Sequence, residues 1–236
     1  METNFVILAA GRGVRLGGDV PKPLTVLADG RTILQQQLDN LVEAFGESVL
    51  GRTTVVVGYR AEVIRSALPE SVNTVLNADY ETTNTARSLV LGLAKVPAKS
   101  AAMWLNGDVV FDSSILQRAK GLLASKSSFA VVEQGPTGEE EVKYALDGQG
   151  FISAISKTVN PAMGEAVGIN HVAASELAHF ADALLRVRPQ DYFEAAMELS
   201  IRNRRPWLPL PVGDAYAVEV DFPEDLQRAN RAQSRA

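Results

Sequence analysis

The stretch that decides the fold is Phe5–Leu24, which reads FVILAAGRGVRLGGDVPKPL. An apolar strand runs directly into a loop that holds four glycines and three cations: Gly11, Gly13, Gly17, Gly18, Arg12, Arg15 and Lys22. Glycine lets backbone N–H groups approach an anion closely, and the cations supply the opposite charge. The stretch therefore predicts a binding site for a polyphosphate.

Two other kinds of glycine-rich loop are excluded. A dinucleotide-binding loop reads G-x-G-x-x-G and opens a helix. Here Leu16 stands in place of the third glycine, and Pro21 and Pro23 oppose a continuous helix. The P-loop pattern G-x-x-x-x-G-K-[ST] occurs nowhere in the chain. A glycine-rich surface loop with scattered basic residues stays as the alternative to a polyphosphate site.

The order of residues in this stretch resembles the signature of the nucleotidyltransferase superfamily, L-A-A-G-x-G-x-R-(L/M)-x-x-x-x-P-K-x-L. The resemblance implies transfer from a nucleoside triphosphate to a phosphorylated acceptor, with release of pyrophosphate. Arg15 would steady the leaving phosphates, and Lys22 would bridge the α-phosphate and the acceptor. The implied nucleotide contacts in this stretch are Leu8, Ala9, Ala10, Gly11, Arg12 and Gly13.

Composition narrows the class of protein. A chain of 236 residues with 46% hydrophobic and 22% charged residues fits one soluble globular domain. The net charge of −5 disfavours a general nucleic-acid or anionic-membrane surface. There is no apolar run of roughly 18 residues, no visible signal peptide and no cysteine, so we expect a cytoplasmic protein. A homodimer is left open.

Strand-like and helix-like segments alternate through the first half of the chain. This order predicts an α/β, Rossmann-like fold, with a mainly parallel sheet and helices on both faces. Thr32 and Gln35 form a capping box that opens the first helix. The expected strands are Asn4–Ala9, Thr53–Val57, Val72–Leu76 and Ala101–Asn106, and the later helices are Ala61–Leu68, Thr85–Lys95 and Ile115–Leu123.

The second half is less regular. A small hairpin is expected from Val142–Leu146 and Phe151–Ile155. Further strands are expected at Phe129–Glu133, Ala166–Val172 and Tyr216–Val220, and helices at Ser175–Leu185, Gln190–Asn203 and Pro223–Ala232. We therefore predict one domain, 1–236, with a nucleotide-binding part at about 1–125, an acceptor-binding part at about 126–210 and a closing metal strand and helix at about 211–236.

Three carboxylates are candidate ligands for Mg²⁺, the cation that usually accompanies a polyphosphate and that prefers oxygen ligands. Asp108 follows the strand Ala101–Asn106, and the carboxyl ends of parallel strands are where open α/β sheets bind ligands. Glu219 and Asp221 lie two residues apart, on one side of a strand. By the same resemblance, Asp108 falls on the superfamily's strand-end metal Asp, and Glu219 and Asp221 resemble the second metal motif of the phosphocholine cytidylyltransferase branch. As alternatives to metal binding, Asp108 could be a turn residue and Asp221 a helix N-cap. Asp112 is interpreted as the cap of the next helix.

The segment Asn77–Leu93 looks like the N-x-x-Y-x-x-(T/S)-N-(T/N)-x-x-S-L stretch of phosphocholine and aminoethylphosphonate cytidylyltransferases. The resemblance implies that Asn84 and Ser88 contact cytosine, and that Asn106 and Gly107 join the nucleotide site. Helix capping is the alternative for Asn84. No aromatic cage for a quaternary ammonium is evident, because Ala86 and Arg87 stand where tyrosine is common.

The segments Glu139–Lys157 and Gly164–Ile169 resemble the acceptor region of the same branch. Lys157 would hold the acceptor phosphate, and Glu165 would meet a polar or cationic group; a solvent-facing pair is the alternative. The sequence thus predicts a Mg²⁺-dependent cytidylyltransferase that couples CTP to a small phosphorylated or phosphonylated acceptor. A sugar-1-phosphate nucleotidyltransferase that uses UTP, GTP or dTTP is one alternative, and a catalytically silent nucleotide-binding regulator is another.

Overall fold

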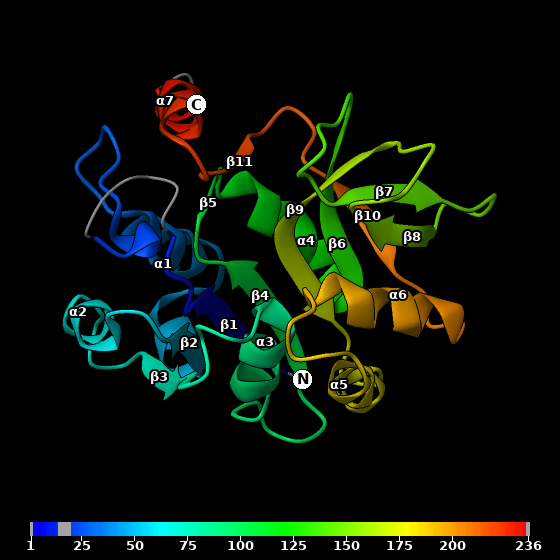
Figure 1. Cartoon of the computed structure of the whole chain (residues 1–236), viewed down its shortest axis with the longest axis horizontal. Coiled ribbons are helices and arrows are strands. Elements are labelled where there is room, and N and C mark those ends of the chain that lie inside the picture. The colour runs from blue at the N-terminus through cyan, green and yellow to red at the C-terminus, as the bar shows by residue number, and fades with distance from the viewer. Residues whose placement is uncertain (1, 14–19, 235–236) are drawn as a thin grey trace.

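A mixed sheet runs through the centre of the protein (Figure 1). The structure is a computed structural model that describes residues 2–13 and 20–234. Within these residues the sheet has nine strands, with the central order β10-β6-β9-β4-β1-β2-β3. The parallel part consists of β1 (Thr3–Ala9), β2 (Thr53–Val57), β3 (Asn73–Leu76) and β4 (Ala101–Asn106). β9 (Gly164–Val172) runs antiparallel to β4 and to β6 (Phe129–Gln134).

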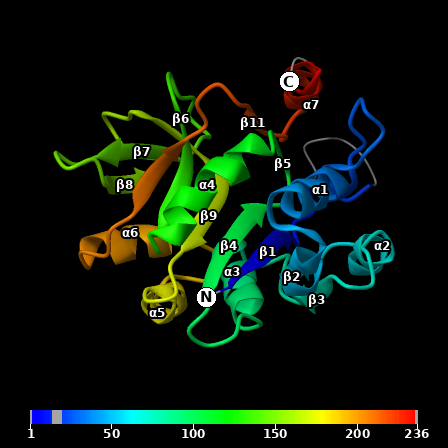
Figure 2. The same cartoon turned by 180° about the vertical axis from the view of Figure 1, so that it is seen from behind.

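Helices cover both faces of this sheet, as Figures 1 and 2 show from opposite sides. One apolar cluster joins one face to α1 (Ile33–Phe45), α2 (Ala61–Ser66) and α4 (Ser114–Ala124), and includes Val49 of the 3₁₀ turn η3 (Glu47–Arg52). A second cluster joins the other face to α3 (Thr85–Leu93), α5 (Leu177–Arg186) and α6 (Glu194–Arg202). The predicted α/β class and its two helical layers are therefore confirmed.

The end of the chain returns to the carboxyl edge of β4 through a second, two-stranded sheet. β5 (Val109–Phe111) pairs antiparallel with β11 (Ala217–Glu219), and Val109 lies opposite Glu219. α7 (Pro223–Gln233) follows and packs Ala229 into a third, smaller apolar cluster with Val110, Val218 and Val220. This small sheet therefore joins the middle of the sequence to its C-terminal part.

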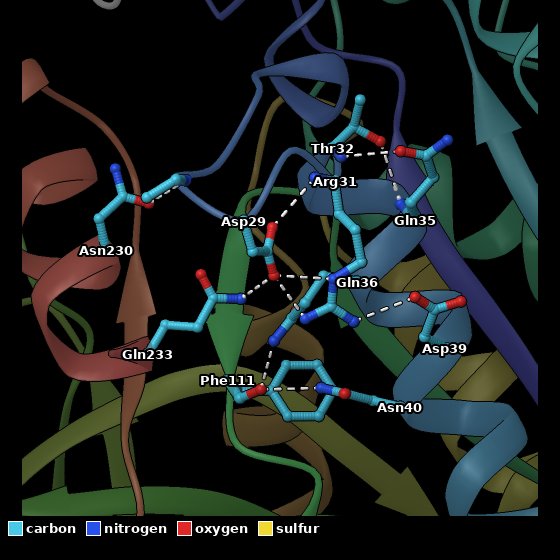
Figure 3. Close-up of polar contacts among 11 residues, drawn as sticks. Asp29, Arg31, Thr32, Gln35, Gln36, Asp39, Asn40, Phe111, Asn230 and Gln233 are labelled. Atoms are coloured by element: carbon cyan, nitrogen blue, oxygen red, sulfur yellow. Dashed lines mark hydrogen bonds and ion pairs between the residues drawn. The ribbon is translucent and has the colours of Figure 1, made fainter. Parts of the chain in front are cut away.

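Polar side chains fix α7 and β5 against α1 (Figure 3). The capping box is present, since Thr32 and Gln35 exchange side-chain and backbone hydrogen bonds at the start of α1. Asp29 accepts hydrogen bonds from Arg31 Nε at 2.8 Å and from Gln233 Nε2 of α7 at 2.7 Å. Gln36 on the buried side of α1 donates to the Phe111 carbonyl of β5 at 2.6 Å. α1 thus holds β5 in place, and the segment before α1 holds α7.

The expected hairpin is present, and most element boundaries agree with expectation. β7 (Lys143–Leu146) pairs with β8 (Ile152–Ser156), and β7 also pairs with β9. The edge strand β10 (Leu208–Pro211) was not expected, because two of its four residues are prolines, which a central strand does not tolerate. In the described part of the chain, no helix is long and apolar enough to cross a membrane.

Candidate functional site

A cleft of about 340 Å³ lies at the carboxyl ends of β1 and β4. Its lining includes the following predicted site residues: Leu8, Ala9, Gly11, Gly13, Lys22, Asn84, Asn106, Gly107, Asp108, Lys157, Glu219 and Asp221. The described lining does not include Ala10, Arg12, Ser88 or Glu165, and Arg15 lies outside the described residues. The structure therefore brings the ends of the sequence and its middle to one place.

Lys22 lies at the floor of this cleft, on the short 3₁₀ turn η2 (Lys22–Leu24). Only 8% of the residue is exposed. Its Nζ donates to Asp108 Oδ2 at 2.8 Å and to Asp221 Oδ1 at 2.5 Å. Burial opposes the ammonium charge, but the two carboxylates outweigh it, so the pKa of Lys22 is raised above its ordinary value. Lys22 is therefore a fixed positive charge.

Gly13 explains how the chain can pass so close to Lys22. Its φ is +55°, and a Cβ built there would lie 2.7 Å from Cβ of Lys22. Both the left-handed backbone and the missing side chain are thus needed at this position.

The three predicted metal carboxylates converge because of strand pairing. The backbone N–H of Val220 donates to the Asp108 carbonyl at 2.9 Å, which extends the β5–β11 pairing. Val218 and Val220 are buried in the third apolar cluster, whereas Glu219 and Asp221 line the cleft. The predicted alternation is therefore confirmed. Asp221 does not cap α7, since Phe222 occupies the N-cap position.

The donor set fits a hard divalent cation. Three carboxylates face one ammonium, and Oδ1 of Asp108 is buried without a hydrogen-bond partner. Although Glu219 keeps an exposed surface, desolvation and then the charges of Asp108 and Asp221 raise its pKa well above the ordinary value. Among the described residues, no group of three acids or histidines converges closely enough to enclose a metal alone. Mg²⁺ commonly binds one or two carboxylates and completes its shell with water and substrate oxygens.

Asn84 and Ser88, the predicted base contacts, have different positions. Asn84 lines the cleft and also caps α3, because its Oδ1 accepts from the Thr85 N–H at 2.9 Å. Ser88 is buried, and its Oγ accepts from Asn77 Nδ2 at 3.1 Å. Ser88 therefore holds the segment before α3 in place, whereas Asn84 has access to a bound molecule.

Asn106 and Gly107 form the wall of the cleft at the end of β4. A Cβ on Gly107 would lie 2.6 Å from the Leu8 carbonyl oxygen, so β1 and β4 can approach here only without a side chain. Oδ1 of Asn106 is buried and has no hydrogen-bond partner. Asn106 therefore holds a buried acceptor that no described donor satisfies.

Arg12 lies outside the cleft lining. Its guanidinium lies 3.7 Å from Glu81 and 5.7 Å from the ring centre of Tyr59. Ala10 is buried and its carbonyl accepts from the Tyr59 N–H at 3.0 Å. Ala10 therefore connects the loop to the end of β2, and the predicted nucleotide contacts of both residues stay predictions.

Lys157 and Glu165, the predicted acceptor residues, lie on different sides of the hairpin region. Lys157 lines the cleft, where its Nζ pairs with Glu140 at 3.1 Å and lies 5.2 Å from the ring centre of Tyr192. On β9 it is Ala166, next to Glu165, that faces the cleft. Burial, together with Glu141 and Glu133, raises the pKa of Glu165 to about 7. The predicted role of Glu165 remains untested.

The cleft lining also contains residues that the sequence did not predict: Pro23, Thr85, Glu140, Val142, Ala166, Tyr192, Phe193 and Glu194. Glu194 is buried, and desolvation raises its pKa to about 7 although the charge of Lys157 opposes this. A signal was present in the sequence: Glu194 shares the apolar face of its helix with Met197, one turn further on. An acid on an apolar helical face indicates a buried polar function.

Comparison with known proteins identifies the family and the fold of this chain. Residues 5–155 match the MobA-like NTP transferase domain. The bifunctional protein GlmU of Saccharophagus degradans is 31% identical over 232 residues, which cover 94% of this chain and 47% of that protein. The chain thus spans about half the length of this relative.

Two solved structures share the fold. The inositol-1-phosphate CTP transferase from T. maritima has a TM-score of 0.77 at 19% identity and covers 98% of this chain and 95% of its own. A UDP-glucose pyrophosphorylase complexed with UDP-glucose has a TM-score of 0.80 at 13% identity. The match covers 100% of this chain and 99% of that chain. Because the family match extends over more than half of the sequence, the chain belongs to the family of MobA-like NTP transferase domains, within the nucleotidyltransferase superfamily.

Proposed function

We propose that this protein is a Mg²⁺-dependent nucleotidyltransferase that couples CTP to a small phosphorylated or phosphonylated acceptor. One observation carries the proposal. The ammonium of Lys22 is held between Asp108 and Asp221, at the meeting point of the glycine-rich loop and the carboxyl edge of β4. A buried cation flanked by metal-binding oxygens is the arrangement that phosphoryl chemistry needs, since charge neutralisation and positioning supply most of its catalysis.

In the proposed reaction, an oxygen of the acceptor phosphate or phosphonate attacks the α-phosphorus of CTP. A new phosphorus–oxygen bond forms, the bond from the α-phosphorus to the bridging oxygen breaks, and pyrophosphate leaves with the electron pair. No strong base is required, because a phosphomonoester is largely ionised at neutral pH. Lys22 would hold the α-phosphate and the attacking oxygen together, which lowers the repulsion between two anions.

Asp108 and Asp221, with Glu219, would hold the magnesium ion. When bound, Mg²⁺ neutralises phosphate charge and polarises the phosphoryl group. Arg15 would steady the leaving pyrophosphate. Asn84 would read the base, and its position on the cleft lining supports this role. Lys157, which lines the same cleft, would also contact the acceptor's phosphate.

Transfer to a sugar 1-phosphate from UTP, GTP or dTTP is the second candidate, favoured by the similarity to a UDP-glucose pyrophosphorylase. The preference for CTP is supported by the resemblance of the Asn77–Leu93 segment and by the similarity to an inositol-1-phosphate CTP transferase. Both candidates use the same metal chemistry, so they differ in base and acceptor only.

Pyrophosphate release over a matrix of triphosphates and acceptors tests the proposal. We expect CTP to exceed UTP by at least about tenfold in kcat/KM, the discrimination of roughly one hydrogen bond. Lys22→Ala should lower kcat by about 100-fold or more and change the affinity for CTP much less. Lys120→Ala, on the exposed side of α4, is the control. Preference for GTP, dTTP or UTP would favour the second candidate, and no release with any triphosphate would leave a silent nucleotide-binding protein.

A further inference from the structure

The strand β9 is irregular opposite the end of β4. Antiparallel pairing between the two strands ends at Leu105 and Ile169, so Gly168 is the residue that would come next, opposite Asn106. The register of β9 against β6 also shifts over this stretch. Gly168 has a φ of +71°, in the left-handed region that favours glycine. A bulge of this kind bends the strand and redirects the side chains around it.

The side chain of Asn106 lies against the bare backbone of Gly168. A Cβ built on Gly168 would lie 2.7 Å from Nδ2 and 2.9 Å from Cγ of Asn106, closer than a real Cβ packs. The backbone of Asn106 is held from other sides, because its carbonyl accepts from Gln37 Nε2 at 2.8 Å and the residue pairs with Leu8 of β1. A side chain at position 168 would therefore have to displace the amide of Asn106.

The amide of Asn106 has one atom available for a ligand. Its Oδ1 is buried, whereas its Nδ2 keeps accessible surface, and neither atom has a hydrogen-bond partner among the described residues. Asn106 lines the cleft two residues before Asp108, and its partner Leu8 lies just before the glycine-rich loop. An N–H donor between this loop and the metal carboxylates requires an acceptor atom, and an oxygen of the nucleotide supplies one.

We infer that Gly168 is a positioning residue for nucleotide binding: its left-handed conformation and its missing side chain hold the amide of Asn106 toward an oxygen of the nucleotide. This inference rests on the proposed function. If Gly168 served the strand alone, its replacement would lower stability, and its effect on binding would not depend on Asn106. Coupling between Gly168 and Asn106 in nucleotide binding therefore distinguishes a positioning role from a structural one.

A double-mutant cycle measures this coupling. Binding of the preferred triphosphate with Mg²⁺, CTP under the proposed function, is measured by calorimetry without acceptor. The proteins are the wild type, Gly168→Ala, Asn106→Ala and the double variant. Gly168→Asn is the second variant if Gly168→Ala does not fold, because asparagine tolerates a left-handed φ.

Gly30→Ala is the matched control. Gly30 also has a left-handed φ, +87°, but a Cβ there would meet nothing within 4 Å. The control therefore reproduces the backbone strain without a contact to Asn106. The side-chain amide signal of Asn106, identified by its loss in Asn106→Ala, is followed by ¹H–¹⁵N NMR in each protein that retains Asn106, with and without the nucleotide.

Asn106→Ala and Gly168→Ala should each weaken binding by about five- to tenfold, the contribution of roughly one hydrogen bond. The double variant should bind no more weakly than Asn106→Ala alone, and Gly30→Ala should bind like the wild type. Addition of the nucleotide should shift the Asn106 signal in the wild type and in Gly30→Ala, and should leave it unchanged in Gly168→Ala.

Additive losses in the double variant, an unchanged affinity in Gly168→Ala, or an equal loss in Gly30→Ala would overturn the inference. An Asn106 signal that the nucleotide does not shift in the wild type would also overturn it. In each of these cases, pyrophosphate release by the wild type would still support the proposed function. If the cycle is as expected but no acceptor yields pyrophosphate, the inference stands and the proposed function fails. Binding of no triphosphate would overturn both.

Discussion

Replacing Glu194 by glutamine should stabilise the protein at alkaline pH and have little effect at acidic pH. Burial raises the pKa of Glu194 from an ordinary 4.5 to about 7. Below the ordinary pKa the carboxyl is protonated in both the folded and the unfolded protein, so it contributes no pH dependence. Between the two pKa values the folded protein retains the proton more strongly, and stability therefore falls as the pH rises.

The size of the effect follows from the same two pKa values. At roughly 1.4 kcal/mol for each pKa unit, keeping Glu194 ionised in the folded protein costs about 3 kcal/mol above pH 7. Glutamine is neutral at every pH and similar in shape to the protonated acid. The difference in unfolding free energy between Glu194→Gln and the wild type should therefore grow by up to about 3 kcal/mol from acidic to alkaline pH.

Urea unfolding at about pH 4.5 and about pH 8, without ligand, measures this difference. Titrating groups that do not interact with Glu194, such as Glu165, cancel in the comparison, whereas loss of the Glu194 charge also eases ionisation of Glu219. Glu198→Gln, one turn further along α6, supplies the matched control and should not show the same increase. A free-energy difference that is independent of pH, or a Glu194→Gln variant that is less stable than the wild type at pH 8, would refute the reasoning.

Three further predictions concern the metal site, the loop and the core. EDTA should abolish turnover and Mg²⁺ should restore it, while Asp221→Asn should lower kcat by about 100-fold or more with an unchanged circular dichroism spectrum. Gly13→Ala should destabilise the protein by about 1–2 kcal/mol, because the φ of Gly13 is +55°. It should also displace Lys22, which would be seen as lost turnover. Gly121→Ala is the control and should have neither effect, because a Cβ at Gly121 meets open space. His171 is buried, and its pKa is lowered to about 4. The free energy of unfolding should therefore fall by about 3 kcal/mol as the pH decreases from 6.5 to 4. His171→Gln should reduce this loss, as measured by urea unfolding.

The central strands could be predicted from sequence because their patterns are local. β2 and β4 have the predicted bounds, since each is a continuous apolar run of the kind that a sheet buried on both faces requires. The edge strand β10 could not be predicted, because Pro209 and Pro211 remove backbone donors. Only its place at the edge, parallel to β6, makes the prolines tolerable.

Part of the candidate site could be predicted, because some of its residues also lie in local sequence patterns. Asp108 and Glu219 belong to strand ends whose position follows from alternation and topology. The contacts of Lys22 join residues that are 86 and 199 positions apart, and no local pattern contains such distances. Glu194 was missed because the sequence places the helix start at Gln190, whereas residues before Glu194 instead dock on α3.

We propose that, under the proposed function, metal and nucleotide bind near Lys22 as one species. Asp108, Glu219 and Asp221 line the cleft around the single ammonium of Lys22. With all three carboxylates ionised, this group would carry about two net negative charges, which attract a divalent cation and repel a free triphosphate. Desolvation is the largest cause of the elevated pKa of Glu219, and the charges of Asp108 and Asp221 add to it. A magnesium–triphosphate complex relieves the repulsion and supplies phosphate oxygens to the cation at the same time. We therefore propose that this acidic wall favours a magnesium–triphosphate complex over the free nucleotide, and that Lys22 compensates the charges of Asp108 and Asp221 before the complex binds.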